Sequence, residues 1–240
     1  MRSWIVAALV SLPACAQPVE MPKPNYCFGF LNAVANRPQL PQEEVLRIQK
    51  EHLAHLGALA EKRWLVAAGP ILTPGGPRGL LISRCRSVAE ANELASADPA
   101  VKNRRLWVES YLWTGPDGIG DAYWKGKEAN PQAADRMLKH SIVFLRKGAS
   151  WSGWPAKEVL EAHFANVRSL KKATRLVAAG PLHDGGARLG VFVFEETAID
   201  EARRLVEQDP LVAGGHASVE AYEWLVADGV FPKAAVVPSR

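Results

Sequence analysis

The chain has 240 residues, of which 48% are hydrophobic and 22% charged, and its formal net charge is +4. This composition is ordinary for a globular protein of one or two domains. The basic residues occur only as short pairs such as Arg104-Arg105, without interleaved aromatic side chains. That pattern argues against a nucleic-acid-binding surface.

The first residues are typical of an export signal. A basic residue precedes an apolar stretch over 4–12 that is too short to span a bilayer, and small residues then suit cleavage before Gln17. We therefore expect residues 1–16 to be a signal peptide and the mature protein to be periplasmic or secreted. The same stretch resembles a bacterial lipoprotein signal, which would place a lipid anchor at Cys15. An apolar N-terminal strand is the alternative to both. No later segment is apolar and long enough to cross a membrane.

The first half of the chain begins with a predicted strand, helix, strand and strand. An apolar stretch over 27–34 predicts the first strand. Pro41 and the acidic residues after it predict the start of a helix, which continues as an apolar stripe that includes His52. Two further strands are expected over 64–68 and 79–85, separated by a loop rich in glycine and proline.

A second helix and a fourth strand complete this half. Ser87 and Glu90 have the spacing of a capping box, which predicts a helix start. That helix should end at Asp98, because a residue before proline disfavours the α conformation. Alternation over 106–113 predicts the last strand. The resulting order, β-α-β-β-α-β, is the ferredoxin-like one.

The second half repeats the first. The segment Leu-Val-Ala-Ala-Gly-Pro at 65–70 returns at 176–181, an offset of 111 residues. Its strands and helices are expected over 140–145, 155–172, 175–179, 189–194, 198–208 and 218–224. A repeat this long indicates a duplicated domain. We expect domains over 25–114 and 139–226, a linker rich in Gly, Asp and Pro over 115–138, and a tail over 227–240.

Two cysteines remain besides Cys15, and in an exported chain a pair suggests a disulfide. In the predicted order, the first and third strands are antiparallel neighbours. Cys27 begins one and Cys85 ends the other, so a bridge between them is geometrically possible; two buried thiols are the alternative. Neither cysteine has a second Cys or a His at ligand spacing, which argues against a metal site.

One histidine and one aspartate recur in both halves at the offset of 111. His52 and His163 lie in the apolar stripe of the first helix and should face the sheet. Asp98 and Asp209 end the second helix and can approach the same side. A carboxylate on one ring nitrogen would orient the imidazole and leave the other nitrogen as a general base. The alternative is that these residues have only structural roles. An apolar helix face often holds a core histidine, and an Asp before Pro often binds its own backbone.

The other recurrent or reactive residues point less clearly to chemistry. His55 is replaced by Asn166 in the second copy, and His183 and His216 have no counterparts, so we expect none of these histidines to act. Three residues also recur on one face of the last strand, where barrel packing or a cavity wall is expected. They are Glu109, Tyr111 and Trp113, with Glu220, Tyr222 and Trp224.

The helical histidine, the strand ending in Ala-Gly-Pro and the Asp-Pro pair together resemble the YCII-related (YciI-like) family, over roughly 26–113 and 139–225. The resemblance implies a dimeric α+β barrel, in which two ferredoxin-like sheets pack and enclose a cavity. Here the two copies of one chain would form it as an intramolecular pseudo-dimer. The resemblance also implies catalytic pairs, His52 with Asp98 and His163 with Asp209. Many members carry Arg three residues before the histidine, where this chain has Gln49 and Leu160, which would remove an anionic substrate contact.

The family resemblance implies proton-transfer chemistry, as in a lyase that dechlorinates a chlorinated hydroquinone; muconolactone isomerase shares the wider fold. We therefore expect an exported lyase or isomerase that needs no cofactor or metal, with a small ligand such as a hydroxylated aromatic or a lactone. A non-catalytic ligand-binding or scaffold protein of the same fold is the alternative. Haem binding, as in other α+β barrel families, is a third possibility.

Overall fold

Two four-stranded antiparallel sheets form the centre of the molecule in a computed structural model that describes residues 23–183 and 186–233. The strand orders are β2-β3-β1-β4 and β6-β7-β5-β8. The first sheet consists of β1 (Tyr26–Ala33), β2 (Leu65–Pro70), β3 (Gly79–Ser83) and β4 (Leu106–Trp113). The second consists of β5 (Met137–Lys147), β6 (Leu176–Pro181), β7 (Arg188–Glu195) and β8 (Ala217–Ala227).

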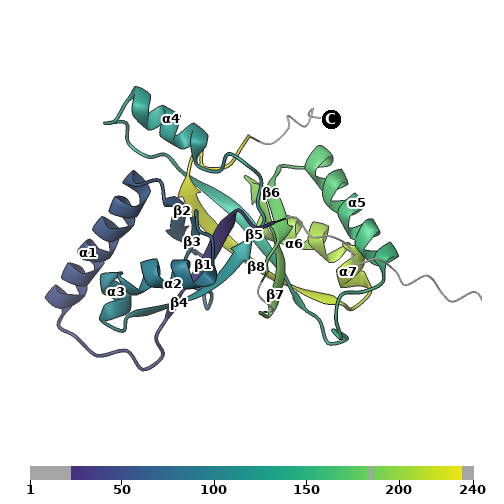
Figure 1. The fold of residues 1–240 in the computed structure, drawn as a ribbon, viewed down its shortest axis with the longest axis horizontal. Coiled ribbons are helices and arrows are strands. Elements are labelled where there is room, and N and C mark those ends of the chain that lie inside the picture. The colour runs from purple at the N-terminus through teal and green to yellow at the C-terminus, as the bar shows by residue number, and fades with distance from the viewer. Residues whose placement is uncertain (1–22, 184–185, 234–240) are drawn as a thin grey trace, which may run out of the picture.

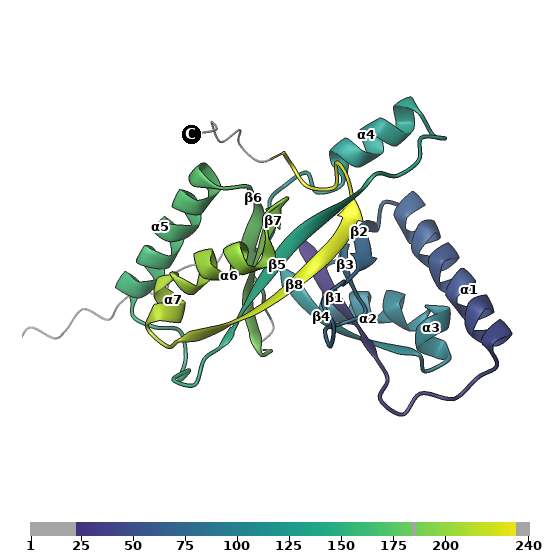
Figure 2. The same cartoon turned by 180° about the vertical axis from the view of Figure 1, so that it is seen from behind.

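The helices cover the outer side of each sheet, so that the two sheets face each other (Figures 1 and 2). The first half contributes α1 (Gln42–Glu61), α2 (Val88–Ser96) and α3 (Pro99–Lys102). The second half contributes α5 (Lys157–Ala173), α6 (Ile199–Glu207) and α7 (Pro210–Ala213), and α4 (Asp121–Ala129) lies between the halves in sequence. This arrangement confirms the expected α+β fold, with two ferredoxin-like halves packed as a barrel.

Aromatic side chains fill the space between the sheets. Phe28 and Phe30 of the first sheet both contact Phe144 of the second, with ring centroids 5.6 and 4.9 Å away. Trp113 and Trp224 are fully buried in the same cluster. These residues alternate along their strands with residues that face the helices, as the two-residue period of a strand requires. The shared core therefore joins the two halves into one body.

The barrel closes where β2 meets β8 and β6 meets the end of β4. Leu72 donates its N–H to Glu223 O at 2.9 Å, and Thr114 donates to Pro181 O at 3.1 Å. At these crossings a Cβ on Gly69 would overlap the carbonyl oxygen of Leu225, and one on Gly180 would overlap that of Thr114. The repeated Ala-Gly-Pro segment is thus explained by the close approach of the opposite half, which only glycine permits.

Three helices were not expected from the sequence. Asp98 and Asp209 do not simply end a helix, because each caps a new short one, α3 and α7, with proline in its first turn. The predicted linker over 115–138 contains α4, and Gly120 N, which precedes that helix, bonds Val230 O at 2.7 Å. Val230 is buried, so the start of the predicted tail packs against α4.

Two expectations from the sequence concern residues that the structure does not describe. The signal peptide over 1–16 and the lipid anchor at Cys15 lie outside the described residues. Within 23–183 and 186–233, no helix combines the length and apolar character that a membrane span needs.

A disulfide joins Cys27 of β1 to Cys85, which follows β3, as the predicted strand order allows. The two Cα atoms are 5.7 Å apart. The bond ties the central strand of the first sheet to its neighbour, next to Ser87, the N-cap of α2.

We expect this disulfide to stabilise the protein through its unfolded state. Its cysteines are 58 residues apart, and closing a loop of that length contributes about 4 kcal/mol in the chain-entropy model. Urea unfolding of the Cys27→Ala, Cys85→Ala variant should show that loss. Dithiothreitol should lower the midpoint of the native protein and leave the variant unchanged, and equal midpoints for both proteins would contradict the expectation.

Candidate functional site

In the first copy, the predicted histidine and aspartate form a buried pair. His52 lies in the third turn of α1 with 7% of its surface exposed, and Asp98 is 3% exposed. His52 Nδ1 lies 2.7 Å from Asp98 Oδ2. The other oxygen of Asp98 accepts the N–H of Ala100 at 2.7 Å, as the cap of α3. The aspartate therefore has both of the roles that the sequence left open, since it caps a helix and binds the ring.

The second copy builds the same pair. His163 Nδ1 lies 2.8 and 2.9 Å from the two oxygens of Asp209, whose side chain is fully buried. Asp209 also accepts the N–H of Leu211 at 3.0 Å and an N–H of the Asn166 amide at 2.9 Å. Asn166 occupies the position of His55, and among the described residues His55 forms no such bond to its aspartate.

The geometry fixes which ring nitrogen carries the proton. An ionised carboxylate can only accept a hydrogen bond, so a neutral ring must hold its proton on Nδ1 and its lone pair on Nε2. Over the described ranges, Nε2 of His52 and of His163 has no hydrogen-bond partner, and neither is an enclosed orphan atom. Each Nε2 is therefore a base open to its surroundings.

Those surroundings are two pockets between helix and sheet. His52 lines a pocket of about 610 Å³ between α1 and the outer face of the first sheet. His163 lines one of about 340 Å³ between α5 and the second sheet. Both volumes suit a small molecule. The family resemblance implied a cavity enclosed between the two sheets, but aromatic side chains fill that space. The two pockets lie instead on the outer face of each sheet, under its helices.

His55 lies one turn after His52 on α1 and lines a small separate pocket with Asp98, whereas His183 and His140 lie away from the pairs. His183 Nε2 contacts Thr114 Oγ1 at 2.8 Å, at the seam between the halves. His140, which the sequence did not single out, is buried against Phe231. Burial lowers the pKa of His140. Within 23–183 and 186–233, no group of three or more His, Cys, Asp or Glu side chains could hold a metal ion.

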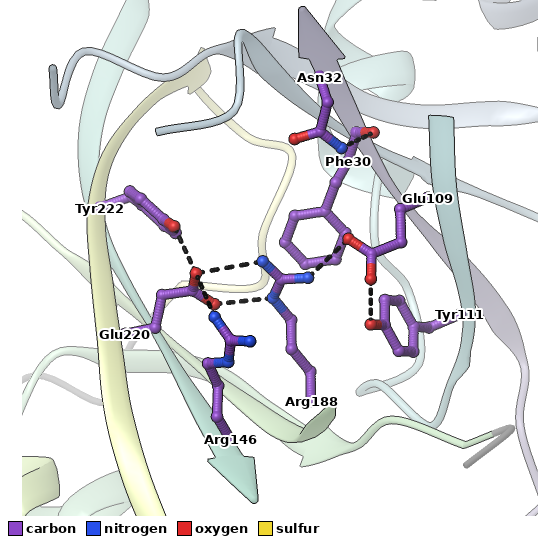
Figure 3. A network of polar contacts seen from close by, with 8 residues as sticks. All are labelled: Phe30, Asn32, Glu109, Tyr111, Arg146, Arg188, Glu220 and Tyr222. Carbon is purple, nitrogen blue, oxygen red and sulfur yellow. Dashed lines mark hydrogen bonds and ion pairs between the residues drawn. The ribbon is translucent and has the colours of Figure 1, made fainter. Parts of the chain in front are cut away.

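A second polar cluster lies between the sheets, and sequence reasoning missed its centre (Figure 3). Arg188 of β7 is 8% exposed and donates to Glu109 Oε2 at 2.8 Å and to Glu220 Oε2 at 2.8 Å. Its guanidinium lies 3.9 Å from the ring centroid of Phe30. The sequence did contain a hint of this cation. Glu109 and Glu220 were expected on an inward face, where carboxylates need a cationic partner, but no basic residue recurs with them in both copies.

The tyrosines next to these glutamates complete the cluster. Tyr111 donates to Glu109, and Tyr222 donates to Glu220 at 2.6 Å. Burial, and then the hydrogen bond to Glu220, raises the pKa of Tyr222 to about 12. Burial alone would lower the pKa of Arg188, but the bonds and charges of its glutamates raise it. The raised pKa values keep Arg188 charged and Tyr222 neutral, which suits a structural role.

We expect the ion pairs of Arg188 to contribute more to the free energy of unfolding than a surface ion pair does. Arg188→Met would leave Glu109 and Glu220 without their shared cation, and breaking a buried pair in this way costs roughly 3 kcal/mol. Urea unfolding measures the loss. The matched control adds Glu109→Gln and Glu220→Gln to the variant and should recover most of the stability, since no buried charge is then left unpaired. Arg146 also loses Glu220 in this control, but its side chain is 43% exposed to water. Wild-type stability of Arg188→Met alone would contradict the assignment.

Comparisons with known proteins agree with this architecture. A mutant chlorite dismutase from Candidatus Nitrospira defluvii has 11% identity and a TM-score of 0.53, covering 83% of this chain and 90% of that chain. A putative chlorite dismutase has 10% identity and a TM-score of 0.52, covering 87% and 97%. A heme-binding protein from Thermus thermophilus has 14% identity and a TM-score of 0.48, covering 86% and 92%. At such low identities, the two chlorite dismutase structures show a shared fold alone.

Sequence comparison identifies the family. No curated protein sequence matches the chain. The model of the YCII-related domain matches it twice, over residues 30–111 and 143–225. Both matches contain the helical histidine, the Ala-Gly-Pro strand and the Asp-Pro cap. The chain therefore belongs to the YCII-related domain family, with two tandem copies of the domain.

Proposed function

We propose that this protein is a small-molecule lyase or isomerase in which a His–Asp pair transfers a proton. One observation carries the proposal. In both halves a histidine that lines a pocket is bonded through Nδ1 to a buried aspartate, while its Nε2 has no hydrogen-bond partner among the described residues. A core histidine would instead have both nitrogens satisfied or enclosed.

Each residue has a distinct role in this chemistry. His52 or His163 takes a proton from a carbon or a phenol of the substrate and returns it at another atom. Asp98 or Asp209 holds the ring in one tautomer and stabilises the imidazolium that forms. The backbone N–H groups of Ala100 and Leu211 keep the carboxylates in place. The largely apolar walls lower the local polarity, which strengthens the interactions of the ion pair as it forms.

The main alternative is a protein that binds a small ligand without turning it over. An open pocket in each half supports ligand binding over a purely structural scaffold, because a scaffold would fill this space with side chains. Ring-sized compounds with an acidic proton, such as hydroxylated aromatics and lactones, fit the proposed chemistry. Turnover separates the enzyme from the binding protein.

Export is a further part of the proposal. The start of the chain has the pattern of a signal peptide. The Cys27–Cys85 disulfide supports a periplasmic or secreted location, since such bonds persist in oxidising compartments.

Proton transfer can be tested without knowing the product. The protein is incubated in D₂O with a panel of hydroxylated aromatics and lactones, and deuterium uptake at carbon is followed by NMR. We expect exchange with at least one compound. His52→Asn with His163→Asn should lower that rate about 10²–10⁴-fold, because asparagine keeps a donor for the aspartate and removes Nε2. Full exchange by the double variant would contradict the proposal.

Controls separate a lost base from a lost fold. The single variants show which copy acts. Asp98→Asn and Asp209→Asn should lower the rate while leaving the pockets intact, because the wrong tautomer is then favoured. His216→Gln, outside both pockets, should match the native protein in rate and in unfolding midpoint.

Haem binding would use the same nitrogen, so the two functions exclude each other at one site. Nε2 of His52 or His163 would hold the iron, and a carboxylate behind the ring is compatible with metal ligation. Bound haem would supply redox chemistry. A nitrogen that binds iron cannot take a proton, so our proposal expects no Soret band from the purified protein and no protein-dependent shift of the Soret band of added hemin. A Soret band lost on substitution of either histidine would favour the haem protein.

A further inference from the structure

We propose that the His52 pocket binds a carboxylate-bearing small molecule, whereas the His163 pocket binds an uncharged one. This inference rests on the proposed function only in treating both pockets as ligand sites. It goes further by assigning a substrate class to each half and by separating two sites that the repeat makes look equivalent.

Three arginines line the His52 pocket, and they gather at one end of the first sheet. Arg37 follows β1, Arg78 precedes β3, and Arg105 precedes β4. The strand register brings these segments together, because Leu31 pairs with Gly79 and Ala33 pairs with Leu106. Three guanidinium groups are thus drawn from separate parts of the sequence to one side of a single cavity.

These arginines have no acidic partner within the described part of the chain. Arg105 donates to the Pro38 carbonyl at 3.1 Å, and none of the three forms a salt bridge. Elsewhere, Arg47, Arg63 and Arg136 all pair with carboxylates. What distinguishes Arg37, Arg78 and Arg105 is that all three line one cavity while no described carboxylate pairs with them.

The acidic residue that lines the same pocket does not offset this charge. Asp135 is bound by Lys127 at 2.8 Å and accepts the Tyr123 hydroxyl at 3.3 Å. With that pair neutral, the pocket has a positive end and largely apolar walls along β2. An arginine fork recognises a carboxylate through parallel N–H donors, and the walls suit the carbon skeleton that carries it.

The second copy does not repeat these arginines. At the offset of 111, Arg37 corresponds to Gly148 and Arg105 to His216, and neither lines the His163 pocket. Gly79 and Gly190 face Pro70 and Pro181 in the same register, which fixes the offset of 111 between the copies. At that offset Arg78 becomes Leu189 and Gln49 becomes Leu160, and both leucines line the His163 pocket. Lys171 is the one Lys, Arg, Asp or Glu among the lining residues. A carboxylate there would meet a single lysine among largely apolar walls, in place of three arginines, which disfavours its binding.

The arginines of the His52 pocket can replace the arginine that many family members carry three residues before the histidine. Gln49 stands at that position on α1, and the sequence therefore implied that an anionic contact was missing. In the structure, arginines from the sheet end line the same pocket as Gln49. The proposed anion contacts therefore come from the segments that flank the strands and not from α1.

The test compares benzoate with the uncharged benzyl alcohol. Long-range ¹H–¹⁵N spectra report both histidine rings, which His52→Asn and His163→Asn assign. We expect benzoate to shift the His52 signals saturably, with little change at His163. Arg78→Leu with Arg105→Gln should weaken benzoate binding at least tenfold, because charge-assisted bonds are lost. Added NaCl should also weaken it. Benzyl alcohol binding should not respond to either change.

Matched controls keep the outcomes separate. Arg78→Leu installs the residue that the second copy carries, and Lys171→Ala should leave benzoate binding unchanged. His52→Asn removes the proposed base but should keep benzoate affinity within a few-fold, followed by the fluorescence of Trp124, which lines the pocket. Loss of turnover and loss of anion binding are thus measured independently. No saturable His52 shift, or benzoate binding that survives the arginine substitutions, would overturn the inference.

Discussion

The backbone crossings at Gly69 and Gly180 are the constraint on which the rest of the structure depends. At each crossing the edge strand of one half meets the carbonyl groups of the other so closely that a side chain would not fit. The barrel closes there, and its aromatic core becomes continuous. The same strands, β2 and β6, form walls of the two pockets. Closure of the fold and placement of the candidate sites therefore share one cause.

Much of this arrangement follows from local sequence patterns. Helical and strand periodicities predict the β-α-β-β-α-β order, because each element buries one face. The His–Asp pairs were predictable from their recurrence, since the first helix and the end of the second approach the same side of the sheet. The strand order likewise placed Cys27 beside Cys85. In each case a short-range pattern and one topological rule were sufficient.

Other features depend on contacts that no local pattern contains. The short helices after Asp98 and Asp209 form because those carboxylates cap them, while α4 is held by the chain beyond β8. Arg188 has no counterpart in the first copy, so the repeat could not reveal it. The arginines of the His52 pocket are far apart in sequence and meet only through strand register. The location of the pockets depends on how the aromatic core is filled.

The single arginine between Glu109 and Glu220 makes the two halves of the chain non-equivalent. In a twofold-symmetric homodimer every side chain occurs twice, so one cation cannot serve two related carboxylates without a second copy of itself. Two first halves would face each other with glutamates and no arginine, whereas two second halves would supply one Arg188 for each Glu220. The first half therefore depends on the second for its buried cation, and the two halves are not interchangeable.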